Sequence, residues 1–548
     1  MNFPALLARH CAEKPHATAF YDVDAAVSYT TLAAEADRVA ALLHVRGARA
    51  GDRLALWLPN CTPWLVIFLA CARLGVTVVA MNTRFRSREV GDLISRGRCR
   101  WLAMWPSFKG LPFRQILNDV EPALLAGLEA VLVVGEDAAG AEAPVLGKDV
   151  LRYTDTAPAG ILDRVPTPAD TTQALVYTTS GTTSLPKLVV HDQRTLLGHG
   201  AHVAAFQGIT GGDAVLLGAP LCGAFGFSSA LAGLAVGAPL VSSPVLDAAQ
   251  CVRQIRQYGV THTFANNELL ARILDTAGDQ PAPLPTLRIA GFASFAPSLN
   301  DLPERAARAG ITLVGLYGSS ELQALIAAQP ADAPATQRHQ AGGRLAWPEA
   351  SVRVRDTASG ALLPYGEVGE IEIRSPSLMK QYLDNDAATR AAIDDEGYFR
   401  TGDLGLALDE RSFIFRARKG DYLRLSGFLV NPVEIERFIE TLDGVQACQV
   451  VGAEHAGKTV PVAFFITAAG KAVSEAAIIA HCKASLAHFK VPVRAAMIDT
   501  FPVVESANSN KIQRGRLQEM ARALLDTPGS AAASRNTSVA GAHTPPGA

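Results

Sequence analysis

The sequence TTSGTTSLPK at residues 178–187 follows an apolar segment, QALVY, at residues 173–177. The apolar segment predicts a buried strand, and the loop after it is crowded with hydroxyl side chains and ends in Lys187. Hydroxyls and backbone N–H groups in such a loop can cradle phosphate oxygens, and lysine adds a compact positive charge. The loop lacks the adjacent Gly-Lys-Ser/Thr of the usual phosphate loop. Because a plain polar turn seldom carries this density of hydroxyls, the segment predicts a phosphate-binding loop.

Three further segments carry reactive side chains. In GLYGSSE (residues 315–321), which follows the strand-like ITLV, an aromatic ring could stack on a base and a carboxylate could hold Mg²⁺. In YFRTGDLG (398–405), Asp403 lies in what we expect to be a tight turn and could accept hydrogen bonds from two ribose hydroxyls. NSNKIQRGRL (508–517) contains Lys511. Taken singly, GLYGSSE is equally compatible with a strand-ending turn, whereas an ordinary turn is favoured for Asp403 and a solvated surface for Lys511.

The composition is that of a globular protein. Of the 548 residues, 49% are hydrophobic and 19% are charged, and the net charge of -2 argues against a nucleic-acid partner. The eight cysteines form no C-x-x-C pair, and the N-terminus lacks a signal-peptide pattern, so we expect a reducing, cytoplasmic location. The apolar residues 64–81 are interrupted by Arg73 and Gly75, which favours a buried helix followed by a strand over a membrane span.

The order of predicted elements indicates an α/β fold with two domains. Up to about residue 415, helical segments alternate with short apolar strands, as expected for layered, largely parallel sheets. A basic, glycine-containing segment then leads into a compact α+β pattern of about 110 residues. We therefore predict a large multi-layer α/β domain at 1–418, a small mobile α+β domain at 421–526, and a disordered tail at 527–548.

Together and in this order, the four segments resemble the motifs of the adenylate-forming superfamily of acyl-CoA synthetases, adenylation domains and luciferases. The resemblance covers roughly residues 5–520. It implies that ATP is bound by Thr179, Ser180, Gly181, Thr182, Thr183, Lys187, Tyr317, Gly318, Ser319, Ser320, Asp403 and Arg418. It further implies that Glu321 binds Mg²⁺ and that Lys511, Glu321 and Lys187 are catalytic. RKGDYLRLSGFLVNPVEIE at residues 418–436 resembles the superfamily's hinge, with Gly420 as pivot and Ser426 and Gly427 lining the coenzyme A channel.

Two other segments, PLCGAFGF (220–227) and AGFASFAPSL (290–299), correspond to acyl- and nucleotide-pocket motifs. The predicted substrate pocket comprises Cys222, Gly223, Phe225, Gly226, His262, Gly291, Phe292, Ala293, Gly315 and Leu322. Members that activate amino acids carry an ammonium-binding aspartate near this segment. Gly226 stands where we align that aspartate, which argues against an α-amino acid substrate.

Four positions depart from the superfamily pattern. Ser184, Ala417 and Asn510 stand where glycines are usual, and Gly420 stands where the hinge usually carries Lys or Asp. These changes are mild because the side chains that carry the chemistry remain, and they leave an altered rate or an unusual second step as alternatives.

The resemblance implies an ATP-dependent ligase that converts a fatty, cyclic or aromatic carboxylic acid into an acyl-adenylate and then into a coenzyme A thioester. Its cofactors would be ATP, Mg²⁺ and coenzyme A, with no nucleic acid and no membrane span. A ligase that loads an acyl carrier protein with the same adenylate is the alternative. A non-catalytic binding protein of the same fold is a third interpretation, and it is disfavoured because Lys187, Glu321, Asp403, Arg418 and Lys511 are all retained.

Overall fold

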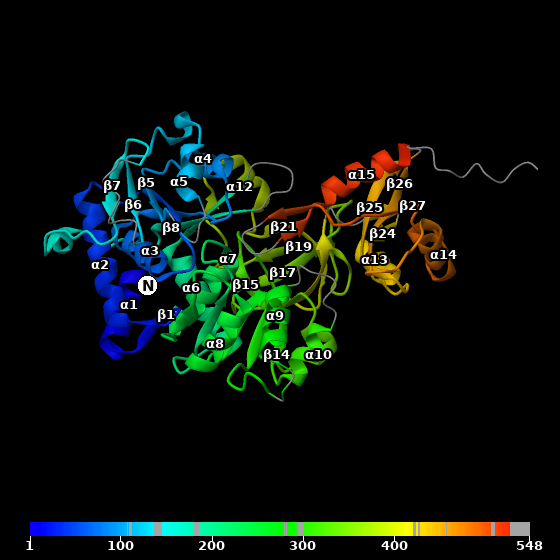
Figure 1. The fold of residues 1–548 in the computed structure, drawn as a ribbon, viewed down its shortest axis with the longest axis horizontal. Coiled ribbons are helices and arrows are strands. Elements are labelled where there is room, and N and C mark those ends of the chain that lie inside the picture. Colours follow the sequence, from blue (N-terminus) through cyan, green and yellow to red (C-terminus); the bar gives the residue numbers. More distant parts are fainter. Residues whose placement is uncertain are drawn as a thin grey trace, which may run out of the picture. The chain divides into compact units, whose positions relative to one another are not determined.

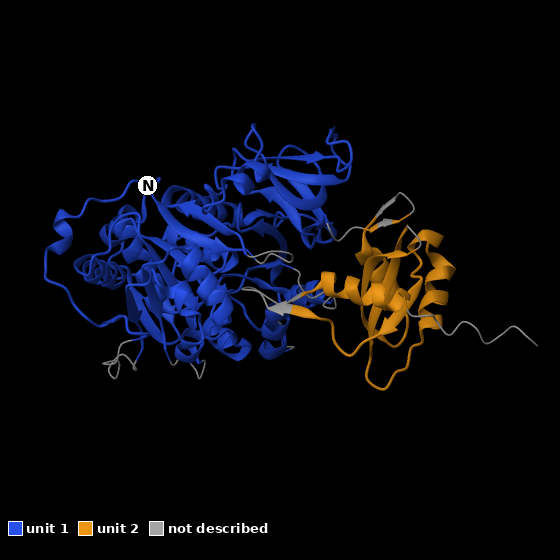
Figure 2. Ribbon diagram, turned by 90° about the horizontal axis from the view of Figure 1, so that it is seen from above, with its two compact units in different colours: residues 1–419, 504–511 blue, residues 420–503, 512–548 orange. Residues whose placement is uncertain are grey.

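The protein folds into two compact units. The computed structural model describes residues 1–106, 108, 112–135, 145–179, 186–278, 280, 282–293, 301–419, 423–425, 428–455, 458–505 and 510–526. Unit 1 comprises residues 1–419 and 504–511, and unit 2 comprises 420–503 and 512–548 (Figure 2). The predicted tail at 527–548 lies outside the described residues. The predicted class, a large α/β domain with a smaller C-terminal domain, is confirmed.

One sheet of unit 1 has eight strands and carries the predicted phosphate loop. Its spatial order is β20 (Gln381–Tyr382), β9 (Leu188–Asp192), β8 (Gln173–Thr178), β4 (Thr77–Ala80), β3 (Arg53–Trp57), β5 (Trp101–Met104), β6 (Ala130–Val133) and β7 (Asp149–Arg152). From β8 to β7 neighbouring strands are parallel, whereas β9 and β20 pair antiparallel at one edge. The predicted strand before the loop is therefore β8, and the chain returns from the loop along β9.

The second sheet of unit 1 has fourteen strands and is mixed. Its order is β18 (Leu362–Leu363), β17 (Ser351–Arg355), β19 (Gly369–Arg374), β21 (Phe399–Ala407), β22 (Ser412–Arg418), β16 (Gly342–Leu345), β15 (Gln323–Ala328), β14 (Thr312–Ser319), β13 (Ile289–Ala293), β12 (His262–Asn266), β10 (Val215–Gly218), β11 (Leu240–Ser242), β1 (Thr18–Asp22) and β2 (Ala25–Ser28). Strands from β1 through β14 are parallel, and the pairings from β14 through β18 are antiparallel. The expectation of largely parallel sheets is confirmed for the eight-stranded sheet and for the β1-to-β14 part of this sheet, and it is wrong for the part from β14 to β18.

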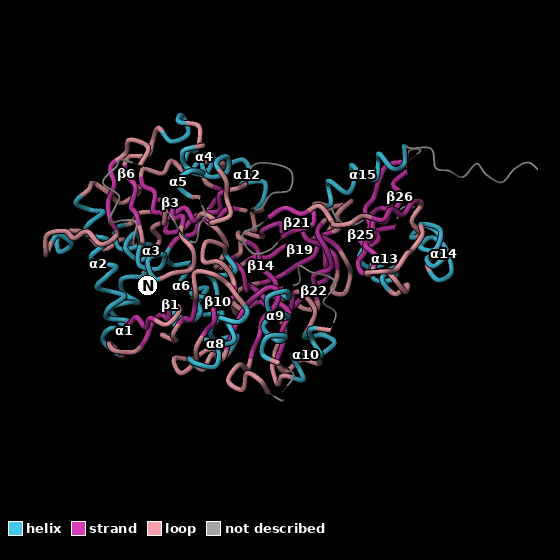
Figure 3. The backbone as a smooth tube through the Cα atoms, in the orientation of Figure 1, coloured by secondary structure: helices cyan, strands magenta, loops and turns pink. Residues whose placement is uncertain are grey.

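Helices pack on the sheets in layers. The central layer contains α1 (Phe3–Glu13), α2 (Tyr29–Val45), α3 (Thr62–Leu74), α6 (Gln193–Gln207) and α7 (Ala224–Val236). The outer layers are α4 (Ser87–Arg96) with α5 (Phe113–Asn118), and α8 (Ala248–Tyr258) with α9 (Asn267–Ala277) and α10 (Leu302–Arg308). Figure 1 and Figure 3 show α8, α9 and α10 near one another, and they share one hydrophobic core. Two short helices, α11 (Ala335–Arg338) and α12 (Asp386–Ala392), complete unit 1.

The alternation of side chains along β3 explains the layering. Leu54 and Leu56 join the central core with α3, while Ala55 and Trp57 join the core under α4 and α5. A strand that buries both faces reads as a continuous apolar run, which is why LALW lacks polar alternation. The predicted helix and strand at residues 64–81 are α3 and β4. No helix in the described part of the chain is both long enough and apolar enough to cross a bilayer.

Unit 2 is a small α+β body. Its three-stranded sheet consists of β25 (Val445–His455), β26 (Lys458–Thr467) and β27 (Arg494–Met497), and its helices are α13 (Pro432–Glu440), α14 (Glu475–Ser485) and α15 (Arg514–Asp526). A short antiparallel hairpin of β23 (Leu423–Leu425) and β24 (Phe428–Val430) completes it. The two-stranded sheet of β28 (Val503–Glu505) and β29 (Asn510–Ile512) lies mostly in residues 504–511, which belong to unit 1. Asn431 and Ser474 cap α13 and α14 through their side chains, as the helix starts in the sequence predict.

Candidate functional site

The predicted phosphate loop is closed at its base by paired backbone. Strands β8 and β9 are antiparallel, with Thr178 opposite Leu188. The Thr179 N–H donates to the Lys187 carbonyl at 3.0 Å, and the Lys187 N–H donates to Thr179 Oγ1 at 3.1 Å. Ser180, Gly181, Thr182 and Thr183 lie outside the described residues. The hairpin thus fixes the positions of Thr179 and Lys187, the first and last residues at the base of the loop.

Tyr382, which the sequence analysis did not single out, lies between Lys187 and Glu321. Its hydroxyl donates to Glu321 Oε1 at 2.8 Å, and the Lys187 Nζ lies over its ring at 4.5 Å from the centroid. Strand β20 pairs antiparallel with β9, which sets Tyr382 opposite Val189, two residues after Lys187. The Met379 N–H also donates to the Glu321 carbonyl at 2.7 Å. Three segments far apart in the sequence therefore meet at Tyr382, which contacts both Lys187 and Glu321.

A buried histidine holds the turn that carries Glu321. His191 Nε2 lies 2.8 Å from the Ser320 carbonyl, and the side chain is fully buried on β9. Burial lowers the pKa of His191 to about 4, so the ring is neutral and donates its Nε2–H to that carbonyl. The Leu322 N–H donates to Ser319 Oγ at 3.2 Å within the same turn. The only sequence signal for His191 is a polar residue directly after the apolar LVV of this strand.

Asp403 lies between a tyrosine and an arginine. The Tyr317 hydroxyl donates to Asp403 Oδ2 at 2.6 Å, and Arg418 Nε lies 3.2 Å from Oδ1. Burial and the adjacent carboxylate raise the pKa of Tyr317 well above its ordinary value, so the phenol keeps its proton. The edge of the Tyr317 ring packs against Phe413, with centroids 5.0 Å apart. The sequence brought Tyr317, Asp403 and Arg418 into one predicted site, and the structure brings them into contact.

The local structure at two motifs differs from the prediction. Asp403 lies within β21, opposite Arg418 on β22, and not in a tight turn. Gly402, with φ of +70°, supplies the left-handed residue that kinks the strand there. Likewise, β14 continues through Tyr317 and Gly318 to Ser319 and does not end before the motif. Strand pairing across the antiparallel half of the sheet extended both elements beyond what the local sequence suggested.

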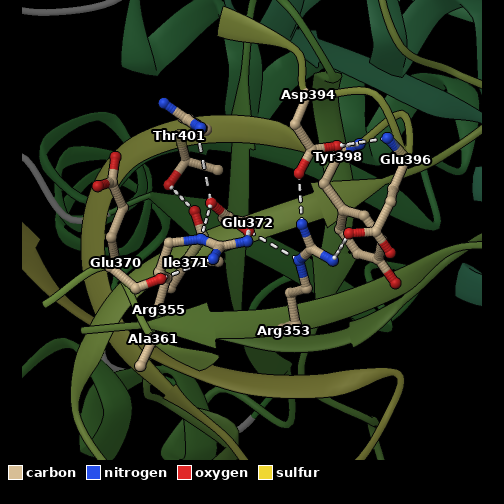
Figure 4. Close-up of polar contacts among 12 residues, drawn as sticks. Arg353, Arg355, Ala361, Glu370, Ile371, Glu372, Asp394, Glu396, Tyr398 and Thr401 are labelled. Carbon is tan, nitrogen blue, oxygen red and sulfur yellow. Dashed lines mark hydrogen bonds and ion pairs between the residues drawn. The ribbon is translucent and has the colours of Figure 1, made fainter. Parts of the chain in front are cut away.

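A charge cluster backs the strand that carries Asp403 (Figure 4). Thr401 Oγ1 accepts from the Asp403 N–H at 3.0 Å and donates to the Ile371 carbonyl at 2.7 Å. The neighbouring Glu372, whose side chain is 1% exposed, pairs with Arg353 Nε at 2.7 Å and with Arg355 Nε at 2.8 Å. A buried carboxylate is costly unless it is paired, so Glu372 requires both arginines. Together with the Thr401 contact, these interactions hold β17, β19 and β21 together.

Most predicted acyl-pocket residues lie at or near the ends of elements that face the same edge of the sheets. Cys222 and Phe225 are buried at the start of α7, with Gly223 as its N-cap residue. Phe292 and Ala293 end β13. Leu322 is fully buried in the turn after Ser320.

At three of the predicted pocket positions, the neighbouring atoms leave no room for a side chain, so glycine is required there by packing. A Cβ at Gly226 would come within 2.2 Å of the Pro220 carbonyl oxygen, and one at Gly315 within 2.0 Å of the Gln340 carbonyl oxygen. A Cβ at Gly291 would meet the side chains of Phe264 and Leu316 at 2.6 and 2.9 Å. The missing side chain of Gly226 thus faces backbone, so this residue gives no evidence against an α-amino acid substrate.

His262 does not join the predicted pocket. It begins β12, at the opposite end of this parallel strand from the carboxyl ends that carry the motifs. Its Nε2 lies 3.2 Å from the Gln207 carbonyl and its Nδ1 lies 2.8 Å from Thr261 Oγ1. We therefore remove His262 from the acyl pocket and regard it as a buried packing residue.

The C-terminal predicted residues are only partly described. Lys511 lies on β29, and Gly420, Ser426 and Gly427 lie outside the described residues. On unit 1, the Lys419 Nζ pairs with Glu370 Oε2 at 2.6 Å, immediately before Gly420. In unit 2, Arg514 Nη2 pairs with the buried Glu436 at 2.8 Å, which fixes the start of α15 three residues after Lys511.

The carboxylate of Glu321 suits a Mg²⁺ ion. Within the described residues, no cluster of three or more His, Cys, Asp or Glu side chains could form an all-protein metal site. Mg²⁺ is commonly held by one or two carboxylates together with substrate phosphates and water. A single carboxylate beside the base of a predicted phosphate loop fits that pattern.

Comparison with known proteins identifies the family. Residues 7–383 match the AMP-binding enzymes, and residues 434–508 match the C-terminal domain of AMP-binding enzymes. The chain is 28% identical over 527 residues to a 3-[(3aS,4S,7aS)-7a-methyl-1,5-dioxo-octahydro-1H-inden-4-yl]propanoyl:CoA ligase of Rhodococcus jostii strain RHA1, covering 94% of this chain and 98% of that protein. It is 29% identical over 520 residues to the fatty acid–[acyl-carrier-protein] ligase ScoC of Streptomyces coeruleorubidus, covering 93% and 94%.

A solved structure shares the fold. The o-succinylbenzoate CoA synthetase of Bacillus subtilis, in complex with its acyl-adenylate intermediate, superposes with a TM-score of 0.76 at 23% identity, covering 94% of this chain and 97% of that one. Because the match to the AMP-binding enzymes spans well over half of the chain, the protein belongs to that enzyme family, and the predicted resemblance to the adenylate-forming superfamily is confirmed.

Proposed function

We propose that the protein uses ATP to convert a carboxylic acid into an acyl-adenylate, with release of pyrophosphate, and then transfers the acyl group to the thiol of coenzyme A. The observation that carries this proposal is the meeting of Lys187, Tyr382 and Glu321 at the base of the phosphate hairpin. A lysine and a carboxylate at that point suit a triphosphate and its Mg²⁺.

The reaction needs charge stabilisation more than a covalent nucleophile. A carboxylate is a poor electrophile, and its attack on the α-phosphate displaces pyrophosphate and leaves AMP as a good leaving group. The transition state spreads negative charge over phosphoryl oxygens, which positioned cations stabilise. Bound at Glu321, Mg²⁺ would supply part of that positive charge.

The proposed roles follow the resemblance of these segments to the motifs of the adenylate-forming superfamily. Lys187 and the loop residues Thr179, Ser180, Gly181, Thr182 and Thr183 hold the triphosphate. Tyr317, Gly318, Ser319 and Ser320 line the adenine and α-phosphate, and Asp403 and Arg418 hold the ribose. Lys511 contacts the acid and the α-phosphate during adenylation. Gly420 is the proposed hinge, and Ser426 and Gly427 line the coenzyme A channel in the second step.

We propose a hydrophobic acid, with a ring or a medium chain, as the substrate class. The start of α7 is apolar, with Cys222 and Phe225 buried there, and its N-cap residue Gly223 has no side chain to occupy space. The relative from Rhodococcus jostii, whose printed substrate is a fused-ring propanoyl acid, is consistent with a bulky cyclic acid.

Coenzyme A is the proposed acceptor, and an acyl carrier protein is the alternative. The alternative has a specific motivation, because the ScoC ligase is as similar to this chain as the coenzyme A ligases are. Both acceptors end in the same type of thiol, so the adenylating site does not distinguish them.

A pyrophosphate-release screen over aromatic, fused-ring and fatty acids tests the proposal. Each acid is assayed with ATP and Mg²⁺ alone, with coenzyme A, and with a holo acyl carrier protein. We expect AMP and pyrophosphate from a hydrophobic acid and thioester formation with coenzyme A. Release of ADP and phosphate would overturn the adenylate route, and thioester formation on the carrier protein alone would establish the alternative acceptor.

The two half-reactions separate the role of Lys511. Lys511→Ala removes a positive charge aimed at the developing phosphoryl charge, so adenylation should fall by roughly 10²–10³-fold. Thioester formation from pre-made acyl-adenylate should be spared. Single-turnover assays of each step measure both effects, and equal loss in the two steps would contradict the assigned role.

A further inference from the structure

We propose that Tyr382 is a positioning residue that holds Lys187 and Glu321 next to each other while keeping them from pairing directly. The inference rests on the proposed function, in which Lys187 binds the triphosphate and Glu321 binds Mg²⁺. Tyr382 is 2% exposed, and it meets the two charged groups in different ways. Its hydroxyl donates to the carboxylate at 2.8 Å, and its ring lies under the ammonium at 4.5 Å.

The position of Tyr382 is fixed by the strand that carries Lys187. The Leu383 N–H donates to the Leu188 carbonyl and the Lys380 N–H donates to the Val190 carbonyl, both at 2.8 Å. The Tyr382 N–H donates to Thr389 Oγ1 at 3.0 Å. Because β9 and β20 are hydrogen-bonded to each other, the backbone of Tyr382 is held beside the strand that begins directly after Lys187.

The tyrosine solves a problem created by placing a lysine beside a carboxylate. A direct ion pair would direct the lysine charge to Glu321 and away from the phosphates, and would offer Mg²⁺ a neutralised ligand. Among the described residues, no ion pair joins Lys187 to Glu321. The ring attracts the ammonium through its negative face, and the hydroxyl attracts the carboxylate through its proton. Each charge is therefore held by a neutral group.

Lysine needs such support because its stem is flexible. The ammonium is carried on four methylene groups and does not orient itself as a guanidinium does. The face of an aromatic ring gives the ammonium a preferred position and does not neutralise its positive charge. When the triphosphate binds, the ammonium can turn toward the phosphate oxygens without first breaking a salt bridge.

The test compares two variants of Tyr382. Tyr382→Phe keeps the ring and removes the hydroxyl, and Tyr382→Leu removes both. The exposed Tyr365→Phe serves as the control, and circular dichroism with thermal melting checks folding. The probes are Mn²⁺, followed by electron paramagnetic resonance as a stand-in for Mg²⁺, and α,β-methylene-ATP, which does not react. Binding is measured for the analogue alone and for Mn²⁺ with the analogue.

We expect Tyr382→Phe to weaken Mn²⁺ binding to the analogue complex by about fivefold to tenfold, the effect of one lost hydrogen bond to a carboxylate. Binding of the analogue without metal should be unchanged. Tyr382→Leu should in addition weaken binding of the metal-free analogue by about two- to fivefold, because the ring beneath Lys187 is gone.

The outcomes distinguish this inference from the proposed function. Wild-type protein that binds neither Mn²⁺ nor the analogue would overturn the proposed function. Wild-type binding with unchanged Mn²⁺ affinity in Tyr382→Phe would overturn the positioning role. A loss of metal-free analogue binding in Tyr382→Phe equal to that in Tyr382→Leu would also overturn it, because the ring would then carry no separate effect. If Tyr382→Leu does not fold, Tyr382→Phe alone decides.

Discussion

Two carboxylates in unit 1 are each held by a tyrosine hydroxyl and a nearby cation, yet the two sets are built differently. In the Asp403 set, Arg418 Nε lies 3.2 Å from the carboxylate that also accepts from Tyr317. In the Glu321 set, the cation Lys187 lies over the ring face of Tyr382, and the Tyr382 hydroxyl donates to the carboxylate. A carboxylate, a tyrosine and a cation thus form both sets, but among the described residues only Asp403 has its cation paired directly with the carboxylate.

The difference suits two kinds of ligand. A carboxylate paired with arginine is stabilised as an anion and can accept hydrogen bonds from neutral donors such as ribose hydroxyls. A carboxylate that receives a phenol hydrogen bond keeps its full charge for a metal ion. We therefore expect changes in the Glu321 set to alter the rate of the chemical step, and changes in the Asp403 set to alter nucleotide affinity.

The largest effect is expected from Glu321→Gln. The amide oxygen can still accept from Tyr382, so the substitution removes the charge and leaves the hydrogen bond. Adenylation should slow by roughly 10²–10³-fold because the Mg²⁺ ligand is lost. ATP–pyrophosphate exchange measures the rate, and the exposed Glu349→Gln is the matched control. A rate within tenfold of wild type would remove Glu321 from the metal site.

Asp403→Asn should act on affinity. The substitution removes the charged acceptor and leaves Arg418 without its anion. A hydrogen bond to a charged group contributes about 1.5–3 kcal/mol, so the KM for ATP should rise by roughly 10- to 100-fold with little change in kcat. Steady-state kinetics with varied ATP separate the two constants. A lowered kcat at unchanged KM would contradict the division between the two sets.

Tyr317→Phe should have a smaller effect of the same kind. Asp403 loses one donor but keeps Arg418 and its charge. The KM for ATP should rise by about fivefold, as expected for about 1 kcal/mol. The same kinetic series as for Asp403→Asn measures it. An effect larger than that of Asp403→Asn would mean that the tyrosine contacts the nucleotide more strongly than the carboxylate does.

The smallest effect concerns the pH dependence of stability. The folded-state pKa of His191, about 4, lies below the ordinary value of 6.5, so the unfolded chain binds a proton first as pH falls. His191 therefore contributes stability that is present above pH 6.5 and is lost as pH falls toward 4. His191→Gln keeps a donor for the Ser320 carbonyl and does not titrate, so its melting temperature should fall less between pH 7 and 5, by roughly 2 °C.

Differential scanning fluorimetry across that pH range measures the difference, with the exposed His16→Gln as control. A parallel decline in wild type and His191→Gln would show that His191 is not protonated on unfolding. Among the described contacts of the two sets, a buried imidazole holds the turn of Glu321 and none holds Asp403. The same measurement therefore tests whether the Glu321 set and the Asp403 set respond differently to acid.

The sequence predicted the reactive groups of both sets but not their supports. The density of hydroxyls before Lys187 predicts a phosphate loop by itself, whereas the roles of Glu321, Asp403 and Arg418 came from the resemblance of their segments to the superfamily's motifs. Tyr382 lies 61 residues beyond Glu321 in the chain, and it reaches the site because β20 pairs with β9. No periodicity or composition in the sequence specifies that pairing.

Long-range pairing also explains the errors. Asp403 was expected in a turn because Gly402 and Gly405 flank it, yet β21 continues through it beside β19 and β22. His262 was assigned to the pocket by its place near an apolar strand. The direction of β12 within the parallel sheet puts it at the far end. Layer order and strand class followed from the sequence, whereas the ends of strands were decided by their neighbours.

The glycines at positions 226, 291 and 315 bear on how the enzyme could be given a new substrate. A directed-evolution library that saturates the predicted acyl pocket would include all three. At Gly226 and Gly315 any side chain would collide with carbonyl oxygens of neighbouring backbone, and at Gly291 it would displace Phe264. Most clones altered there would be lost to misfolding before selectivity could be scored. Randomising only Cys222, Phe225 and Phe292 gives a smaller library, and the variants that fold would show how these side chains set the selectivity for the acid.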